Sequence, residues 1–284
     1  MKASQWKQWL LAATVVMFFF PPASWGSETD TNKEPWEKFG IQAGYFLAAV
    51  DSGFRLGTGI GVDIDVEDLL GLDSDSSVFR VGALWRFTDN RRHRLDFSWF
   101  SLNRDGSRQI LQDIVIEDND GNEIPISAGS TVDAFFDLDI YQFAYSYSFL
   151  QDERLDLAVQ IGAYIMPIDV GLKVAGAIDE QGSARFTAPL PVLGLRMDIA
   201  LTPRWFIRTG VQVFYLEYDN FAGSILEVNA ALEYKPWDHV GIGLGFDTLR
   251  INIEAEGEDY PGIDLNGNVN FGYAGVQLYL RLFY

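Results

Sequence analysis

Two histidines are the first candidates for acid–base chemistry, because imidazole titrates near neutral pH and is the commonest general base. His93 lies in the stretch NRRHR and His239 in KPWDHV, two short polar segments typical of turns. No serine is spaced beside either histidine as a nucleophile would be. The sequence therefore predicts no catalytic site, and we expect the protein not to be an enzyme.

Glycine and aspartate clusters are the next candidates, for phosphate or calcium binding. The glycines of GTGIG (57–61) and GIGLG (241–245) recur at every second residue without a following Lys-Ser or Lys-Thr, which indicates one face of a strand and not a phosphate loop. The run DNDG (118–121) is similar to part of a calcium loop, but Ile116 stands at the first ligand position and Ser127 where a bidentate Glu is needed. Its Asp-Gly pair instead predicts a hairpin turn. No cofactor is expected.

The first 26 residues differ in composition from the rest of the chain. Lys2 and Lys7 precede an apolar run from Trp9 to Phe20, and small residues lead to Gly26. This pattern is typical of a secretory signal peptide cut after Gly26, and the run is too short to span a membrane as a helix.

The remaining chain is strongly acidic. Without the two lysines of the signal peptide, 19 basic and 40 acidic side chains give a net charge of −21. Such a surface excludes nucleic acid as a partner, since phosphates bind to basic surfaces. The chain has no cysteine, so no disulfide framework or lipid attachment site is expected.

Beyond residue 37, apolar residues alternate with polar or small ones at a period of two, which indicates β-strands. Aromatic residues make up 14% of the chain and glycines number 27, a composition typical of strand-rich proteins. The alternation predicts ten strands that are long for a soluble protein. These segments are 39–49, 79–87, 94–99, 141–149, 155–165, 193–199, 205–213, 228–234, 240–246 and 275–284.

The connections between these strands are unequal in length. Short polar turns at 88–93, 151–154, 202–204 and 235–239 alternate with connections at 117–130, 173–185, 219–223 and 254–268, three of which are long. This asymmetry predicts an all-β protein, a single transmembrane antiparallel up-and-down barrel of about ten strands, with 8 or 12 as alternatives. The short turns would then face the periplasm. A secreted two-sheet sandwich is the soluble alternative, and the strand lengths and loop asymmetry favour the barrel.

Three segments add detail to this architecture. Residues 107–130 predict a hairpin above the membrane, and residues 51–77 either continue the first strand or add a further hairpin. The apolar face also changes from even to odd positions after Asp137 and Asp139, with a similar change at Asp247. A β-bulge at the rim, or a strand that outgrows the bilayer and packs differently above it, would produce this change.

The final stretch, VQLYLRLFY, carries apolar residues at every second position and an aromatic at the end. These residues are Val276, Leu278, Leu280, Leu282 and Tyr284. The stretch resembles the C-terminal strand by which the outer-membrane assembly machinery recognises its substrates, although Tyr replaces the more usual Phe at the end. Over residues 38–284 the chain resembles small Gram-negative barrels of the OmpA and OmpW type, without the peptidoglycan-binding domain of OmpA-type proteins.

This resemblance implies a location in the cell outer membrane. It also implies outer-membrane lipid, lipopolysaccharide and the assembly machinery as partners, and we expect a monomer. The predicted organisation is a signal peptide at 1–26, a short unstructured periplasmic lead-in at 27–37 and the barrel at 38–284.

Charged and polar residues on the inward faces predict the lining of the barrel lumen. They are Arg80, Arg86, Arg94, Asp96, Asp156, Gln160, Arg196, Asp198, Arg204, Arg208, Glu227, Glu233 and Arg281. A polar pore is one interpretation and a salt-bridged plug is the other. Opposite charges at similar heights in a narrow interior favour the plug.

The sequence predicts a non-enzymatic surface or structural barrel, or a narrow pore for small solutes. A lipid-modifying or proteolytic barrel is the alternative. In the last long loop, Glu254, Glu256, Glu258 and Asp259 suit either a solvated loop or a Ca²⁺ or Mg²⁺ site shared with lipopolysaccharide phosphates.

Overall fold

The computed structural model describes residues 35–56, 64–65, 75–109, 113–117, 123–174, 181–218, 221–255 and 267–284. The predicted signal peptide and residues 27–34 of the predicted lead-in lie outside these ranges, so both stay predictions. No helix in the described part of the chain has the length and apolar character needed to cross a membrane.

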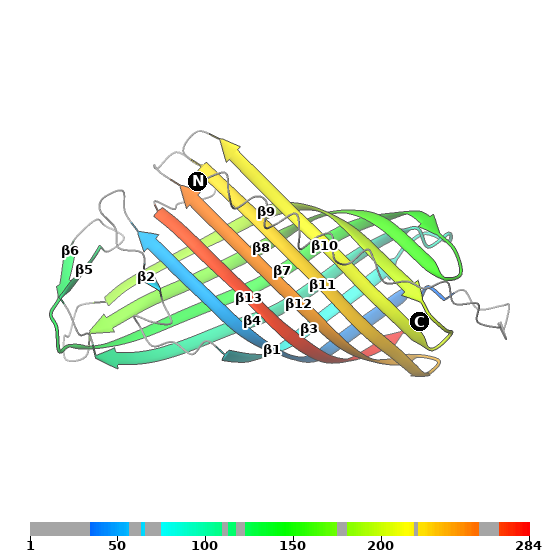
Figure 1. Cartoon of the computed structure of the whole chain (residues 1–284), viewed down its shortest axis with the longest axis horizontal. Helices are drawn as coiled ribbons and strands as arrows, with labels where there is room; N and C mark the ends of the chain where they lie inside the picture. The colour runs from blue at the N-terminus through cyan, green and yellow to red at the C-terminus, as the bar shows by residue number, and fades with distance from the viewer. Residues whose placement is uncertain are drawn as a thin grey trace, which may run out of the picture. The chain divides into compact units, whose positions relative to one another are not determined.

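Ten long antiparallel strands form one closed barrel (Figure 1). Each barrel strand pairs with its sequence neighbours in the barrel, and the first strand closes the barrel on the last from Gly40↔Phe283 to Leu56↔Gly267. The barrel strands are β1 (Phe39–Leu56), β3 (Asp75–Arg86), β4 (His93–Gln109), β7 (Thr131–Gln151), β8 (Leu155–Val174), β9 (Gln181–Ala200), β10 (Trp205–Tyr218), β11 (Phe221–Trp237), β12 (Val240–Ala255) and β13 (Gly267–Phe283). The predicted fold and strand number are confirmed.

Two further elements lie beside the barrel. The hairpin β5 (Ile114–Glu117) and β6 (Glu123–Ile126) forms within the predicted segment 107–130. The two-residue β2 (Ile64–Asp65) pairs with β1, which itself continues to Leu56. The first strand therefore continues beyond residue 50, which is one of the two predicted alternatives for residues 51–77. Residues 57–63 and 66–74 of that segment lie outside the described residues.

The half of the barrel next to the short turns, named here the lower half, has an apolar outer surface and a polar interior. Tyr45, Leu244 and Leu278 form one row across three neighbouring strands, and each side chain is more than 60% exposed. Arg86, Asp156 and other charged residues point inward and are buried. Since an apolar exterior of this extent is unfavourable in water, the lower half requires a hydrocarbon environment.

The upper half reverses this arrangement on the same strands. On β7, Phe136, Leu138 and Ile140 point inward and are buried, whereas Asp137 and Asp139 point outward. The ladders through these positions keep an unbroken register with β4, and the bulges of the barrel lie at the opposite end, near Ser148 and Trp237. The change of phase in the sequence therefore marks the height at which the strands leave the bilayer.

An apolar core fills the upper interior. Phe46 on β1 packs edge-on against Phe100 on β4 and Tyr273 on β13, with ring centroids 6.0 Å and 5.3 Å apart. Phe136 and Phe271 stack across the barrel between β7 and β13. Opposite walls thus touch, so the upper half is a packed two-sheet structure and not an open tube.

Two seams separate these sheets. Pairing between β3 and β4 ends at Arg80↔Phe100, and pairing between β9 and β10 ends at Leu193↔Val213, although β4 and β9 continue upward. Figure 1 shows β4, β7, β8 and β9 diverging from the other strands at this end. The upper parts of these four strands form one sheet, which carries the β5–β6 hairpin above it.

Replacing Leu278 with arginine is expected to reduce the free energy of unfolding by about 2–4 kcal/mol, the cost of an arginine on the lipid face near the bilayer midplane. The same change at Ala274, on the outward face at the upper border of the belt, should cost about 1 kcal/mol or less. Urea unfolding in phospholipid vesicles measures both values. Equal costs at the two positions would contradict the assigned belt.

Candidate functional site in the barrel lumen

The structure gathers most of the predicted lumen residues inside the lower half. Arg80, Arg86, Asp156, Arg196, Asp198, Glu227, Glu233 and Arg281 are buried there, and Arg94, Asp96, Gln160 and Arg208 line the same interior. The prediction that Arg204 lines the lumen is wrong. Arg204 is exposed in the turn before β10, because the strand begins one residue later at Trp205. Arg86 lies below the cavity in a fully buried position.

Asp198 is the centre of the first of two ion-pair groups. Its Oδ2 lies 3.1 Å from Arg94, 3.3 Å from Arg208 and 3.6 Å from Arg86, and it also binds Arg196. Asp156 binds Arg86 at 3.0 Å and Arg196 at 3.1 Å. Both carboxylates are buried, so these contacts replace the water that would otherwise solvate them.

Glu37 and Glu233 form the second group. Glu37 binds Arg208 at 2.8 Å, Lys235 at 3.4 Å and also Arg281. Glu233 binds Arg208 at 3.1 Å and Arg281 at 3.0 Å. Arg208 therefore connects the two groups, since it contacts Asp198, Glu37 and Glu233.

The end of the predicted lead-in enters the lower mouth of the barrel. The indole nitrogen of Trp36 donates to the carbonyl of Asp152 at 2.7 Å, and Arg86 donates to the carbonyl of Glu37 at 2.9 Å. Trp36 also packs against Phe206, and both side chains are buried. For Trp36 and Glu37 the prediction of an unstructured lead-in is wrong: these residues form the floor of the lumen.

A polar cavity of about 180 Å³ remains between this floor and the apolar core above. Six carboxamides share its lining, together with the ion-paired arginines: Gln42, Gln142, Gln160, Gln212, Asn229 and Gln277. At its top, Asp247 binds Arg80, whose guanidinium lies 5.2 Å from the ring of Phe100 in the core. Charged side chains thus lie below the cavity and apolar side chains lie above it.

Sequence reasoning missed several lumen residues. Lys235 lies on the same inward face of β11 as Glu233, and Asp247 lies on the same inward face of β12 as its glycines. The alternation along each strand could therefore have predicted both as lumen residues. Glu37 precedes the first strand, and its three cationic partners lie at least 171 residues away in the sequence. No local pattern indicates such a contact.

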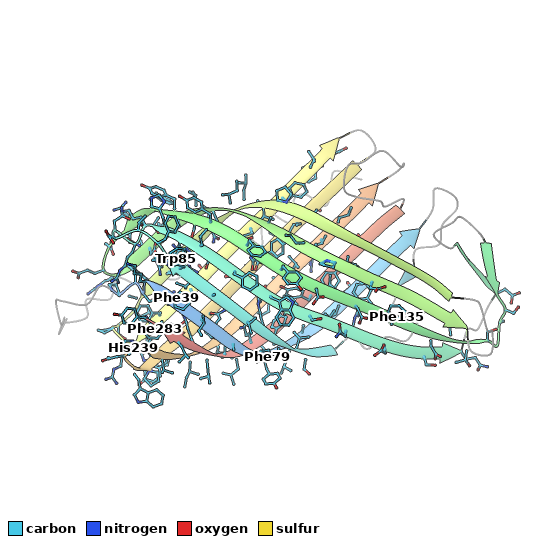
Figure 2. The ribbon with its side chains drawn as sticks, turned by 180° about the vertical axis from the view of Figure 1, so that it is seen from behind. Phe39, Phe79, Trp85, Phe135, His239 and Phe283 are labelled. Carbon is cyan, nitrogen blue, oxygen red and sulfur yellow. The ribbon has the colours of Figure 1, made fainter. Side chains whose placement is uncertain are left out.

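The other candidate residues lie outside the lumen. His93 Nδ1 lies 2.7 Å from the hydroxyl of Tyr145, and His239 Nδ1 lies 3.1 Å from the carbonyl of Phe283. Figure 2 shows His239, Phe283, Phe39 and Trp85 at one end of the barrel, with Phe135 toward the other. Both histidines therefore lie at the short-turn end, among aromatic side chains.

The terminal-strand and metal predictions have different outcomes. Val276, Leu278, Leu280 and Leu282 point outward on β13, and Tyr284 directly after the strand is exposed as well, so a recognition surface would be accessible there. Glu254 is the residue before Ala255 at the end of β12, while Glu256, Glu258 and Asp259 lie outside the described residues. The described ranges hold no group of three His, Cys, Asp or Glu residues that could bind a metal ion.

Comparison with protein families finds no match, and comparison with curated protein sequences finds none either. The outer membrane protease OmpT from Escherichia coli has a similar structure, with a TM-score of 0.53 at 9% identity over 86% of this chain and 97% of that chain. The chain has the fold of an outer-membrane β-barrel. Ail of Yersinia pestis also matches, with a TM-score of 0.33 at 10% identity over 86% of this chain and 99% of that chain.

This fold and the apolar belt locate the barrel in the outer membrane, with the lower half in the bilayer. At such low identity the likeness to OmpT extends to the fold alone. The comparisons support the general class of outer-membrane barrels, and the narrower resemblance to OmpA and OmpW stays a prediction.

Proposed function

We propose that this protein is a non-enzymatic, closed outer-membrane barrel that carries a folded β-sheet head at the cell surface. The observation that supports this proposal is the filled lumen. Ion pairs and the Trp36–Glu37 floor occupy the lower half, and the apolar core fills the upper half. A solute crossing the barrel would have to displace both.

A proteolytic or lipid-modifying barrel is the second candidate, because the fold is similar to that of a protease. The positions of the histidines argue against it. Each histidine ring contacts aromatic side chains at the short-turn end, away from the surface where an external substrate would bind. Mass spectra of lipid A and peptide-cleavage assays, with and without the protein, test this candidate: a lost acyl chain or a cut peptide would overturn our proposal.

Purified protein in a planar lipid bilayer is expected to give no stepwise ionic current, because the ion-pair groups and the apolar core block the lumen. A stable open-channel conductance in the wild-type protein would show that the lumen is a pore. A porin reconstituted in the same bilayers is the positive control.

A cysteine at Ser127 is expected to react with a membrane-impermeant maleimide on intact cells, because this exposed residue follows the β5–β6 hairpin on the outer side. Glu153, exposed in a short turn, is the matched control and should react only after the outer membrane is opened. The natural chain contains no cysteine, so each variant has a single reactive thiol. The reverse labelling pattern would show that the barrel has the opposite orientation in the membrane.

A further inference from the structure

Glu227 differs from the other lumen carboxylates in its partners. Its side chain is 1% exposed and accepts hydrogen bonds from Gln142 at 3.2 Å and Asn229 at 3.4 Å. Within the described part of the chain no cation lies in ion-pair contact with it. Its neighbour Asp247 already binds Arg80, so the top of the cavity holds two carboxylates and one cation.

The lower lumen has the opposite imbalance. It holds six cations, Arg86, Arg94, Arg196, Arg208, Lys235 and Arg281, and five carboxylates, Glu37, Asp96, Asp156, Asp198 and Glu233. Across these two sets seven carboxyl groups face seven basic side chains, but one carboxyl group in excess lies at the top of the cavity and one basic side chain in excess lies below it. Arg104 is also buried, and its guanidinium lies 4.8 Å from the centre of the Phe136 ring in the apolar core above. Ions at such short range inside a barrel interact more strongly than in water.

Two buried amide atoms lack hydrogen-bond partners among the described residues. One lies beside the acidic group at the top of the cavity, and the other lies in a row with a basic group below it. Gln212 Oε1 is an acceptor, and Gln212 pairs directly with Glu227 across β10 and β11. Gln277 Nε2 is a donor, and Gln277 shares a row with Arg208 through Ala231 and Gly245. Both side chains are more than nine-tenths buried and line the cavity. Buried polar groups without partners are uncommon in native proteins.

The two rows are four residues apart on β10, roughly 13 Å along the strand, and long side chains extend into the space between them. The upper row presents Gln212 Oε1 and the Glu227 carboxyl group to a cationic donor, and the lower row presents Gln277 Nε2 beside Arg208 to an anionic acceptor. Water would fill hydrogen bonds at either end but would not match the acidic character of one row and the basic character of the other.

We propose that this cavity binds a small zwitterion of the amino-acid class. Its ammonium group contacts Glu227 and Gln212, and its carboxylate group points toward Arg208 and Gln277. The cavity of about 180 Å³ suits a solute of this size. Access is from the periplasmic side, because the Trp36–Glu37 floor is not a barrel strand and is held by side-chain contacts that can separate without breaking the barrel.

The test is equilibrium dialysis of the full-length mature protein in detergent against radiolabelled glycine, together with melting temperatures in glycine, methylammonium, acetate or glycerol. A ligand that binds only the folded barrel raises its melting temperature. We expect saturable binding of glycine and a larger shift with glycine than with the three other solutes. No binding, or an equal shift with methylammonium or acetate alone, would overturn the zwitterion assignment.

Two variants separate the ends of the site. Glu227→Gln keeps the shape of the side chain, removes an unpaired buried charge and is therefore expected to fold; it should weaken glycine binding roughly tenfold or more. Gln277→Leu should weaken glycine binding while leaving any weak methylammonium shift unchanged. Glycine binding that is unaffected in either folded variant would contradict the proposed orientation.

Discussion

Replacing Asp198 with alanine is expected to lower the free energy of unfolding by about 3–5 kcal/mol, because the change leaves buried cations without a partner. Asp198 binds Arg94, Arg196 and Arg208, and Arg86 lies 3.6 Å away. Once the carboxylate is removed, their like charges repel one another in an interior that water reaches poorly.

Denaturant unfolding in detergent micelles measures this loss. Asp96→Ala is the matched control: the side chain of Asp96 is 22% exposed and pairs with Arg94, so its removal should cost about 1 kcal/mol or less. If the two variants are equally stable, Asp198 does not organise the lumen as described. Asp198→Asn should lie between them, because the amide keeps the shape and loses the charge.

Replacing Phe46 with alanine is expected to cost about 3–5 kcal/mol, the usual loss for a fully buried phenylalanine. Phe46 has no exposed surface, and its ring meets Phe100 and Tyr273 edge-on. A Cβ atom added at Gly275 would lie 2.8 Å from the same ring, which shows how tightly the wall closes on it.

The adjacent residue provides the control for this prediction. Tyr45 is 67% exposed on the lipid face, so Tyr45→Ala removes an aromatic ring from the same strand without opening a cavity in the core. Thermal unfolding in detergent should therefore separate the two variants clearly. A loss at Tyr45 as large as that at Phe46 would mean that the upper lumen is not the packed core described above.

The sequence predicts the barrel well where one rule holds along a strand. Outward positions such as Leu193, Leu244 and Leu278 alternate with small or polar residues, and this alternation indicates strand number and orientation. The same rule underestimates strand length. In the upper half the apolar side chains, such as Phe136 and Leu249, lie on the inward face of their strands. A period-two pattern cannot tell whether such a switch comes from a strand that leaves the bilayer or from a bulge.

The lumen is predictable in composition but not in pairing. Alternation identifies Arg94 and Asp198 as inward residues, whereas their contact joins positions 104 residues apart across the barrel. For the same reason the sequence cannot reveal that Glu227 lacks a cation. That property depends on which charges meet in space, and so does the position of Glu37 in the floor.

The outward aspartates of the upper half have a consequence for biogenesis. Asp51, Asp137, Asp139 and Asp169 lie beyond the hydrocarbon layer in the finished protein, yet they have to traverse it when the strands are inserted from the periplasm. Each charged carboxylate opposes that translocation by about 2.5–3.5 kcal/mol at the bilayer centre. The same barrier opposes withdrawal, so these four side chains slow both the unassisted insertion of the barrel and its extraction from the membrane.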